Sequence, residues 1–264
     1  MNIQGTPRFE PPKPKPPVQP ETKEFSYNPQ DPSVMPEHPV SIDDVVVKNG
    51  KPETDTVKLA NKKAVFGPFG RLRDIKDDPG FKLEAKEDGS FNYAHGEEKH
   101  TAANVFGGAA ATVNKYNQVY SELTGKTIDW SFGKEQLSVS PETGEWPNAF
   151  YARQLEGVHF FDYEGTSTGN SGEVVSHEVG HAVLDAIRPN YFNGMGTETG
   201  AFHEAFGDVM AFLMTLGDDA AVVATQEAML LHVAHGDDGV PAAAPMVEPV
   251  LGAATAARRR DSCT

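Results

Sequence analysis

Residues 176–181 read Ser-His-Glu-Val-Gly-His, and this short segment says most about how the chain folds. In an α-helix each residue turns by about 100°, so His177 and His181 lie one turn apart on one face, where both imidazoles can reach a single ion. Glu178 lies about 60° from His181 on that side, close enough to meet a metal-coordinated water. The pattern His-Glu-x-x-His is typical of a zinc site with an adjacent base. The opposite face of this helix, predicted over residues 172–187, is apolar: Val175, Val179, Ala182, Val183 and Ala186.

A zinc site of this kind needs a third protein ligand, which leaves the fourth position for water. The extended metzincin pattern would place Gly at position 184 and His at position 187, but the chain has Leu184 and Ile187. Cysteine ligation fails as well, because the only cysteine is Cys263, next to the C-terminus. The remaining solution is a glutamate from a following helix, and Glu204 stands in that position.

A second helix is predicted over residues 199–216, and it carries two acids one turn apart. Glu204 and Asp208 form an i, i+4 pair, and like charges at that spacing destabilise a helix with only a structural role. The pair is explained if Glu204 binds the cation and Asp208 accepts a hydrogen bond from a histidine ligand. The core side of this helix is expected to consist of Phe202, Phe206, Val209 and Leu213.

Together the two helices resemble the zinc-binding helix pair of thermolysin-like metallopeptidases, the gluzincins. The likeness rests on the His-Glu-x-x-His motif at 177–181 and the Glu-x-x-x-Asp motif at 204–208. It extends to Asn148, Ala149 and Phe150, which are similar to the edge strand on which that family lays the substrate backbone. The resemblance therefore implies that these three residues bind substrate.

The resemblance also implies a catalytic mechanism. His177, His181 and Glu204 would hold one zinc ion per chain, which polarises the peptide carbonyl and lowers the pKa of a bound water to about 7. Glu178 would take the proton from this water and pass it to the leaving nitrogen. Tyr191 roughly matches a family tyrosine that stabilises the oxyanion, although a surface aromatic explains it equally well.

One further position and two departures complete the comparison with the family pattern. His203 is expected to hydrogen-bond His181, at a position where the family commonly has Asn. The family also supplies a histidine from a helical C-terminal half, and here the only histidines after the two helices are His232 and His235. Either one of these substitutes for it, or that half is missing. Glu173 resembles a calcium ligand, but the acids expected after the second helix are absent, so support for calcium is weak.

Three segments are predicted along the chain. Residues 1–39 are rich in proline, which fixes φ and lacks a donor N–H, so we expect a disordered arm. A linker is the favoured interpretation of this arm over a docking segment for a proline-binding domain. Residues 40–217 are expected to form an α+β, zincin-like catalytic domain, with a strand-rich N-terminal half packed on long helices. Residues 218–264 are interpreted as a partial or disordered C-terminal segment.

The remaining elements follow from turn residues and periodicity. Asn49-Gly50 and Asp88-Gly89 are typical of hairpin turns, and a helix ending at Gly125 is predicted from its i, i+3, i+4 apolar stripe. The corresponding ranges are hairpins at 45–50 and 81–93, a helix at 101–123, and strands at 127–132 and 149–163.

Composition limits the partners. A formal net charge of −15 argues against nucleic acid, because phosphate binding depends on clustered Lys and Arg. No apolar run approaches the roughly 18 residues of a membrane-spanning helix, so no membrane insertion is expected. No signal peptide is visible, which leaves the compartment open between cytoplasmic and secreted by another route.

The sequence therefore predicts a zinc-dependent metalloendopeptidase that acts on polypeptide substrates. Two alternatives remain at this point. One is a truncated, inactive zinc-binding module of the same fold, and the other is a zinc hydrolase of small amides or esters.

Overall fold

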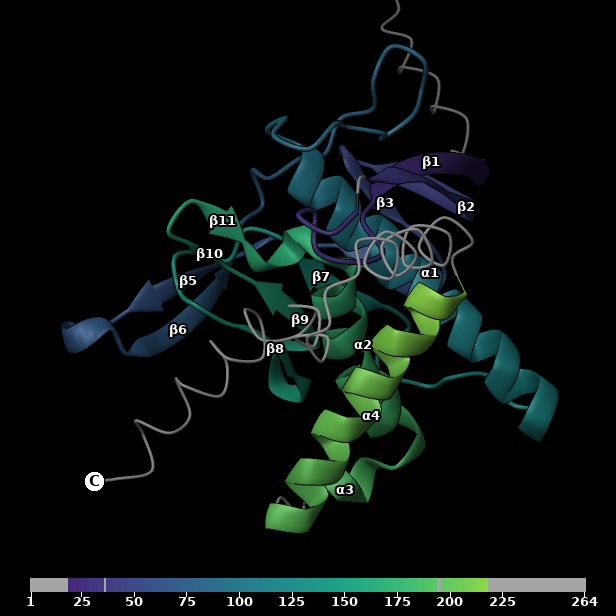
Figure 1. The fold of residues 1–264 in the computed structure, drawn as a ribbon, viewed down its shortest axis with the longest axis vertical. Coiled ribbons are helices and arrows are strands. Elements are labelled where there is room, and N and C mark those ends of the chain that lie inside the picture. The colour runs from purple at the N-terminus through teal and green to yellow at the C-terminus, as the bar shows by residue number, and fades with distance from the viewer. Residues whose placement is uncertain (1–18, 36, 194–195, 218–264) are drawn as a thin grey trace, which may run out of the picture.

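The computed structural model describes residues 19–35, 37–193 and 196–217, which combine strands and helices (Figure 1). Strands dominate up to residue 77, and the long helices begin at residue 100. The predicted α+β class with a strand-rich N-terminal half is confirmed. Residues 218–264, including His232 and His235, lie outside the described residues.

Seven strands form one sheet, in which β8 is an edge strand. Neighbouring strands run antiparallel, except that β7 is parallel to both β4 and β9. In sheet order the strands are β1 (Glu21–Tyr27), β2 (His38–Lys48), β3 (Lys51–Glu53), β4 (Val57–Leu59), β7 (Leu137–Ser140), β9 (Gly157–Phe160) and β8 (Ala149–Ala152). Two separate ribbons pair β5 (Lys62–Phe66) with β6 (Leu72–Asp77) and β10 (Asp162–Tyr163) with β11 (Thr166–Ser167).

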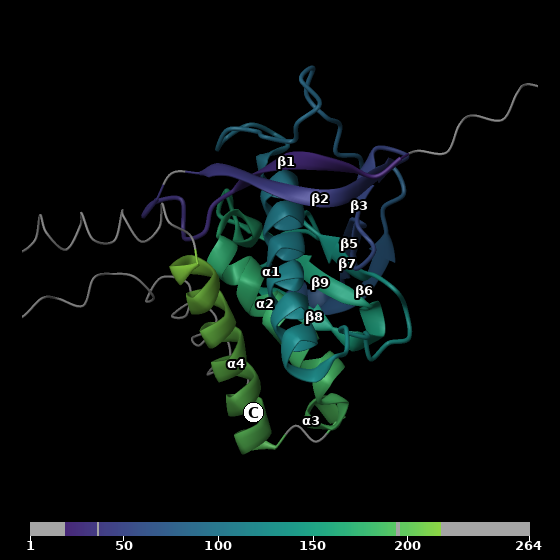
Figure 2. The same cartoon turned by 90° about the vertical axis from the view of Figure 1, so that its right-hand side faces the viewer.

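Helix α1 (His100–Thr124) passes under β1 and β2 with its N-terminal half, as Figure 2 shows, and packs against α2 (Gly172–Ile187). It ends where Gly125 adopts φ +69°, as the sequence predicted. The other helical segments are α3 (Pro189–Asn193), α4 (Thr197–Leu216) and the 3₁₀ turns Pro68–Gly70, Arg153–Leu155 and Thr168–Asn170. None of the helices in the described residues is long and apolar enough to span a bilayer.

Two glycines inside α1 have a packing reason. A Cβ atom at Gly107 would lie 2.8 Å from Cβ of Phe25, and one at Gly108 would lie 3.2 Å from a methyl group of Val175. The absence of side chains therefore lets α1 approach β1 on one side and α2 on the other, which outweighs the helix propensity lost at each glycine.

The predicted boundary of the proline-rich arm is wrong. Residues 21–27 form β1, which pairs along β2, and Phe25 is fully buried. Its ring stacks on Phe91 at a centroid distance of 4.7 Å and packs on Phe106 at 4.9 Å. The prolines on either side concealed this strand, although the stretch Glu21–Asn28 itself contains no proline. Residues 1–18 of the predicted arm lie outside the described residues.

The two predicted hairpins had different outcomes. The first is confirmed: β2 and β3 pair through a turn in which Asn49 and Gly50 have φ +55° and +74°. The second is wrong, because Phe91 pairs with β1 instead of with residues 81–83. Its N–H donates to the carbonyl of Glu24 at 2.7 Å.

Two further predictions need correction. Residues 127–132 form no strand; there Trp130 is buried and donates its indole N–H to the carbonyl of Thr56 at 3.2 Å. The apolar side of α4 was also misplaced, since Phe202, Val209 and Leu213 are about half exposed. The buried side of α4 consists of His203, Gly207, Met210, Ala211 and Thr215. Gly207 on this side lies against Gly180 of α2, where a side chain would keep the two helices apart.

The buried position of Phe25 gives a first prediction. Phe25→Ala removes a ring packed between Phe91 and Phe106, so it should lower the free energy of unfolding by about 3–5 kcal/mol. Val34→Ala is the control, because Val34 is 46% exposed and its truncation should change stability by no more than about 0.5 kcal/mol. Urea unfolding measures both variants. Equal stability of the two variants would contradict the placement of β1 in the core.

Candidate metal centre

Helix α2 presents the two histidines as the sequence predicted. It begins at Ser171, whose hydroxyl accepts from the N–H of Val174 at 3.5 Å, and it ends at Arg188, before Pro189. The rings of His177 and His181 lie 4.8 Å apart between centroids and almost perpendicular, at 88°. Both are mostly buried. The two imidazole rings therefore present their nitrogen atoms side by side on one face of α2.

Helix α4 brings the predicted glutamate to this face. Oε2 of Glu204 lies 3.4 Å from Nε2 of His177 and 3.9 Å from Nε2 of His181. One ligand atom from each of the three residues lies within 4.8 Å of the others. Two imidazole nitrogens and one carboxylate oxygen are the donor set of His₂Glu zinc sites, and the spacing requires only small shifts to close on one ion. The residues present therefore fit a zinc ion.

Asp208 orients the first histidine. Its Oδ1 lies 2.9 Å from Nδ1 of His177, so the predicted hydrogen bond from a histidine to Asp208 is confirmed. With Nδ1 held by the carboxylate, the other ring nitrogen, Nε2, faces Glu204. The i, i+4 acids of α4 therefore have two different tasks: Glu204 faces the ion position, and Asp208 fixes a ligand ring.

The electrostatics of the site favour a positive charge between the two helices. Burial lowers the pKa of His177, but the hydrogen bond with Glu204 and the charges of Glu178, Asp208 and Glu204 outweigh it, so this pKa is raised overall. The raised pKa reflects a proton on His177 that these carboxylates stabilise. Metal binding must displace that proton, so affinity falls as the pH drops below the pKa of His177.

The helices approach closely because both lack a side chain at the crossing. A Cβ atom at Gly180 would lie 2.9 Å from Cα of Gly207 and 3.2 Å from the sulfur of Met210. A Cβ atom at Gly207 would lie 2.9 Å from Nδ1 and Cε1 of His177. Gly180 is the second variable position of the His-Glu-x-x-His motif, and Gly207 precedes Asp208. These two glycines set the distance between the ligands.

A buried carboxylate that the sequence analysis missed anchors the other end of α2. Asp185 is fully buried and forms an ion pair with Arg153. It also accepts from the hydroxyls of Tyr151, at 2.6 Å, and Ser131. The apolar pattern of α2 could not show it, but an aspartate in the last turn of an otherwise apolar stretch was a visible cue. Through Tyr151, this network ties α2 to β8.

The predicted substrate strand lies beside this helix. Ala149 and Phe150 belong to β8, Asn148 immediately precedes it, and β8 occupies the sheet edge and packs against α2. Behind it, His159 pairs with Phe150 across the strands and is fully buried. Burial lowers the pKa of His159 to about 3, so this histidine is neutral and belongs to the core.

The remaining predicted residues are less closely tied to the site. The ring of His203 lies 5.6 Å from that of His181, but Nε2 of His203 has no hydrogen-bond partner among the described residues, so the predicted bond is not shown. Tyr191 is 42% exposed and packs edge-on against Phe202 at 5.7 Å. Glu173 is paired with Gln30 and is not part of any metal-binding group found among the described residues.

The chain matches no protein-family model and no curated protein at a significant level. Its function is therefore argued from the geometry of α2, α4 and β8.

The glycine contact gives a prediction specific to the site. Gly207→Ala places a methyl group against the ring of His177, so it should weaken zinc binding by about 10- to 100-fold, as disturbed ligand orientation commonly does. Gly200→Ala is the matched control on the same helix, because a Cβ atom there meets nothing within 4 Å. Zinc titration against a chelating dye compares them. Equal affinity in the two variants would contradict the role of this contact.

Proposed function

We propose that the chain is a zinc-dependent metalloendopeptidase with a zincin-like, thermolysin-type arrangement of its site. The observation that carries the proposal is the convergence of His177, His181 and Glu204, from two helices, with Asp208 bonded to the first histidine. A His₂Glu ligand set leaves a fourth position open, as catalytic zinc sites do and closed structural sites do not.

When bound, zinc supplies a Lewis acid that lowers the pKa of water and polarises a peptide carbonyl. Glu178 follows His177 on α2 and is buried beside the ligands, where its charge acts on His177. This carboxylate can accept the proton of the attacking water and deliver it to the leaving nitrogen. Its low exposure limits competition from bulk water for that proton.

The edge strand offers a way to hold a polypeptide. An unpaired strand edge can take up an extended peptide through main-chain hydrogen bonds. β8 has such an edge, and the Asp185 network fixes α2 against it. A peptide bound along β8 would therefore run beside the helix that carries Glu178. The position of this strand edge beside α2 supports a peptide substrate over a small ester or amide.

Besides zinc, the residues that could stabilise the oxyanion are Tyr191, His232 and His235. Tyr191 packs on Phe202, and His232 and His235 lie outside the described residues. Loss of one oxyanion donor costs about 10²–10³ in rate, which leaves measurable activity. We therefore expect slow cleavage.

The proposal predicts that zinc-loaded protein cleaves casein, and that a zinc chelator abolishes the cleavage. Glu178→Gln should retain zinc and lose at least about 10²-fold in rate, because it removes only the proton acceptor. Glu198→Gln, in the first turn of α4, is the control and should keep both properties. Gel electrophoresis of casein and zinc analysis of each variant provide the measurements.

The contradicting outcomes separate the alternatives. Zinc-loaded wild-type protein that leaves casein intact at high concentration would support an inactive module. Cleavage of a small amide or ester without cleavage of casein would support a small-molecule hydrolase.

A further inference from the structure

A second group of side chains that could bind a metal lies at the N-terminal end of α1. Glu37 precedes β2, His95 lies in the loop before α1, and His100 is the first residue of α1. One ligand atom of each lies within 4.8 Å of the others, the same limit that the His177 group meets. Nε2 of His100 lies 3.9 Å from Oε2 of Glu37, equal to the separation of Nε2 of His181 and Oε2 of Glu204.

The imidazole of His100 provides the independent observation. Its side chain is 2% exposed, and Nε2 has no hydrogen-bond partner among the described residues. A buried polar atom without a partner is uncommon in proteins and costs free energy unless an ion or water completes it. Coordination of a cation by Nε2 would offset the free-energy cost of burying this nitrogen without a partner.

The ring of His100 is suited to coordination rather than to an ion pair. The neutral ring has a lone pair on one nitrogen, which a metal needs. Because Nε2 of His100 has no hydrogen-bond partner among the described residues, it is the ring nitrogen that is available to a metal.

The side chain of Glu37 is held by a backbone group, and the ring of His95 lies against that of His100. Oε1 of Glu37 accepts from the N–H of His95 at 2.9 Å, which leaves Oε2 toward His100. The rings of His95 and His100 meet edge to face at 5.0 Å. The arrangement therefore joins Glu37, before β2, to two histidines that lie five residues apart at the start of α1.

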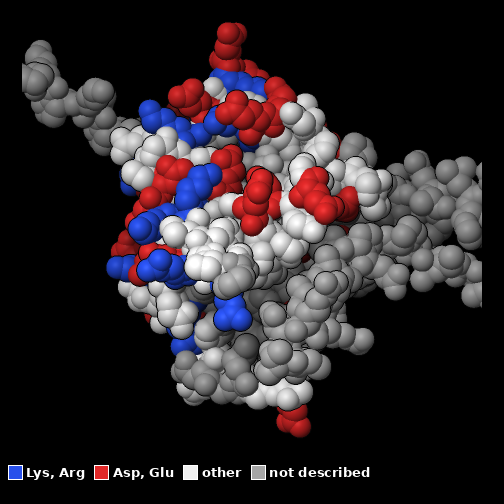
Figure 3. Space-filling model, turned by 90° about the vertical axis from the view of Figure 1, so that its left-hand side faces the viewer, with Lys and Arg blue, Asp and Glu red and all other residues white. Residues whose placement is uncertain are grey.

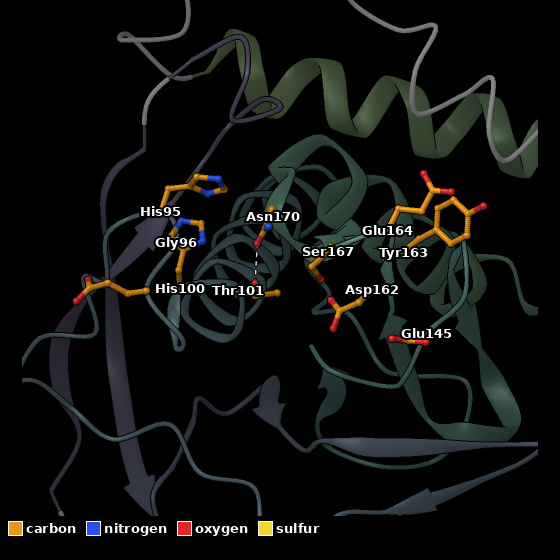
Figure 4. A pocket seen from close by; sticks show the side chains of 12 residues that line it. His95, Gly96, His100, Thr101, Glu145, Asp162, Tyr163, Glu164, Ser167 and Asn170 are labelled. Carbon is orange, nitrogen blue, oxygen red and sulfur yellow. Dashed lines mark hydrogen bonds between the residues drawn. The ribbon is translucent and has the colours of Figure 1, made fainter.

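The surroundings favour a cation. A pocket of about 390 Å³ opens beside the two histidines, and Figure 4 shows them across it from the carboxylates of Asp162, Glu145 and Glu164. Its described lining includes four acids, with Glu97 as the fourth, and no lysine or arginine. Lys and Arg do lie among Asp and Glu on the face of the molecule in Figure 3.

We propose that Glu37, His95 and His100 form a second binding site for a divalent transition metal, and zinc is the metal with which to test it. Two nitrogen donors and one oxygen donor match zinc and disfavour calcium, which prefers six to eight oxygens. Bound metal would link the connection before β2, the loop before α1 and α1 itself. His95 and His100 both line the acidic pocket.

The test uses full-length protein in which the first site is disabled by His177→Ala and His181→Ala. This variant should still bind about one zinc per chain and, with cobalt, give the absorption of a four-coordinate ion. Adding Glu37→Gln and His95→Ala should remove that metal. Glu98→Gln is the matched control, because Glu98 lies three residues from His95 and is highly exposed. It should leave binding unchanged.

Two results would overturn the proposal: a folded His177→Ala, His181→Ala variant that binds no zinc, or one whose zinc survives the additional substitutions. If that background fails to fold, Glu37→Gln with His95→Ala is compared with wild type. Zinc content should then fall by about one per chain while casein cleavage persists, and an unchanged content refutes the second site. Failure of this site is distinct from failure of the first, because each is removed separately.

Discussion

The contact between Gly180 on α2 and Gly207 on α4 fixes the geometry of the candidate metal centre. At the crossing a Cβ atom on either helix would come within 3.0 Å of the other helix, so the two axes approach as closely as backbone allows. This approach brings Glu204 to both histidines and Asp208 to Nδ1 of His177. A wider separation would leave two histidines on one helix and two acids on another. The metal-binding chemistry therefore depends on residues that have no side chain.

Asp185 connects the same helix, α2, to the sheet. Its buried carboxylate forms an ion pair with Arg153 and accepts a hydrogen bond from the hydroxyl of Tyr151. Tyr151 belongs to β8, and Arg153 follows that strand directly. Removing one partner of such a buried pair leaves an uncompensated charge, which is strongly destabilising. The helix with the proposed catalytic base is thus attached to α4 at one face and to the edge strand at its C-terminal end. A peptide on β8 would be positioned relative to Glu178 by this single connected frame.

The sequence predicted the parts of the site that local periodicity governs. His177, His181 and Asp208 follow from helical spacing and from the demand of a cation for ligands, and α1, α2 and α4 follow from apolar stripes and cap residues. Phe25 was missed because the prolines before and after residues 21–28 dominated the composition, although burying one aromatic ring stabilises a strand considerably. The exposed side of α4 was predicted to be its core side because it carries more large apolar residues than the side that packs against α2. The group of Glu37, His95 and His100 has no local spacing, since tertiary folding alone brings these residues together.

The central claim is that a zinc ion sits between α2 and α4, bound by His177, His181 and Glu204. Diffraction from a zinc-loaded crystal, measured on both sides of the zinc absorption edge, locates the ion directly. The account predicts an anomalous peak between these two helices, about 2.0–2.2 Å from one nitrogen of each histidine and one oxygen of Glu204. A zinc-loaded crystal with no peak there, or with Glu204 turned away from the ion, would contradict it.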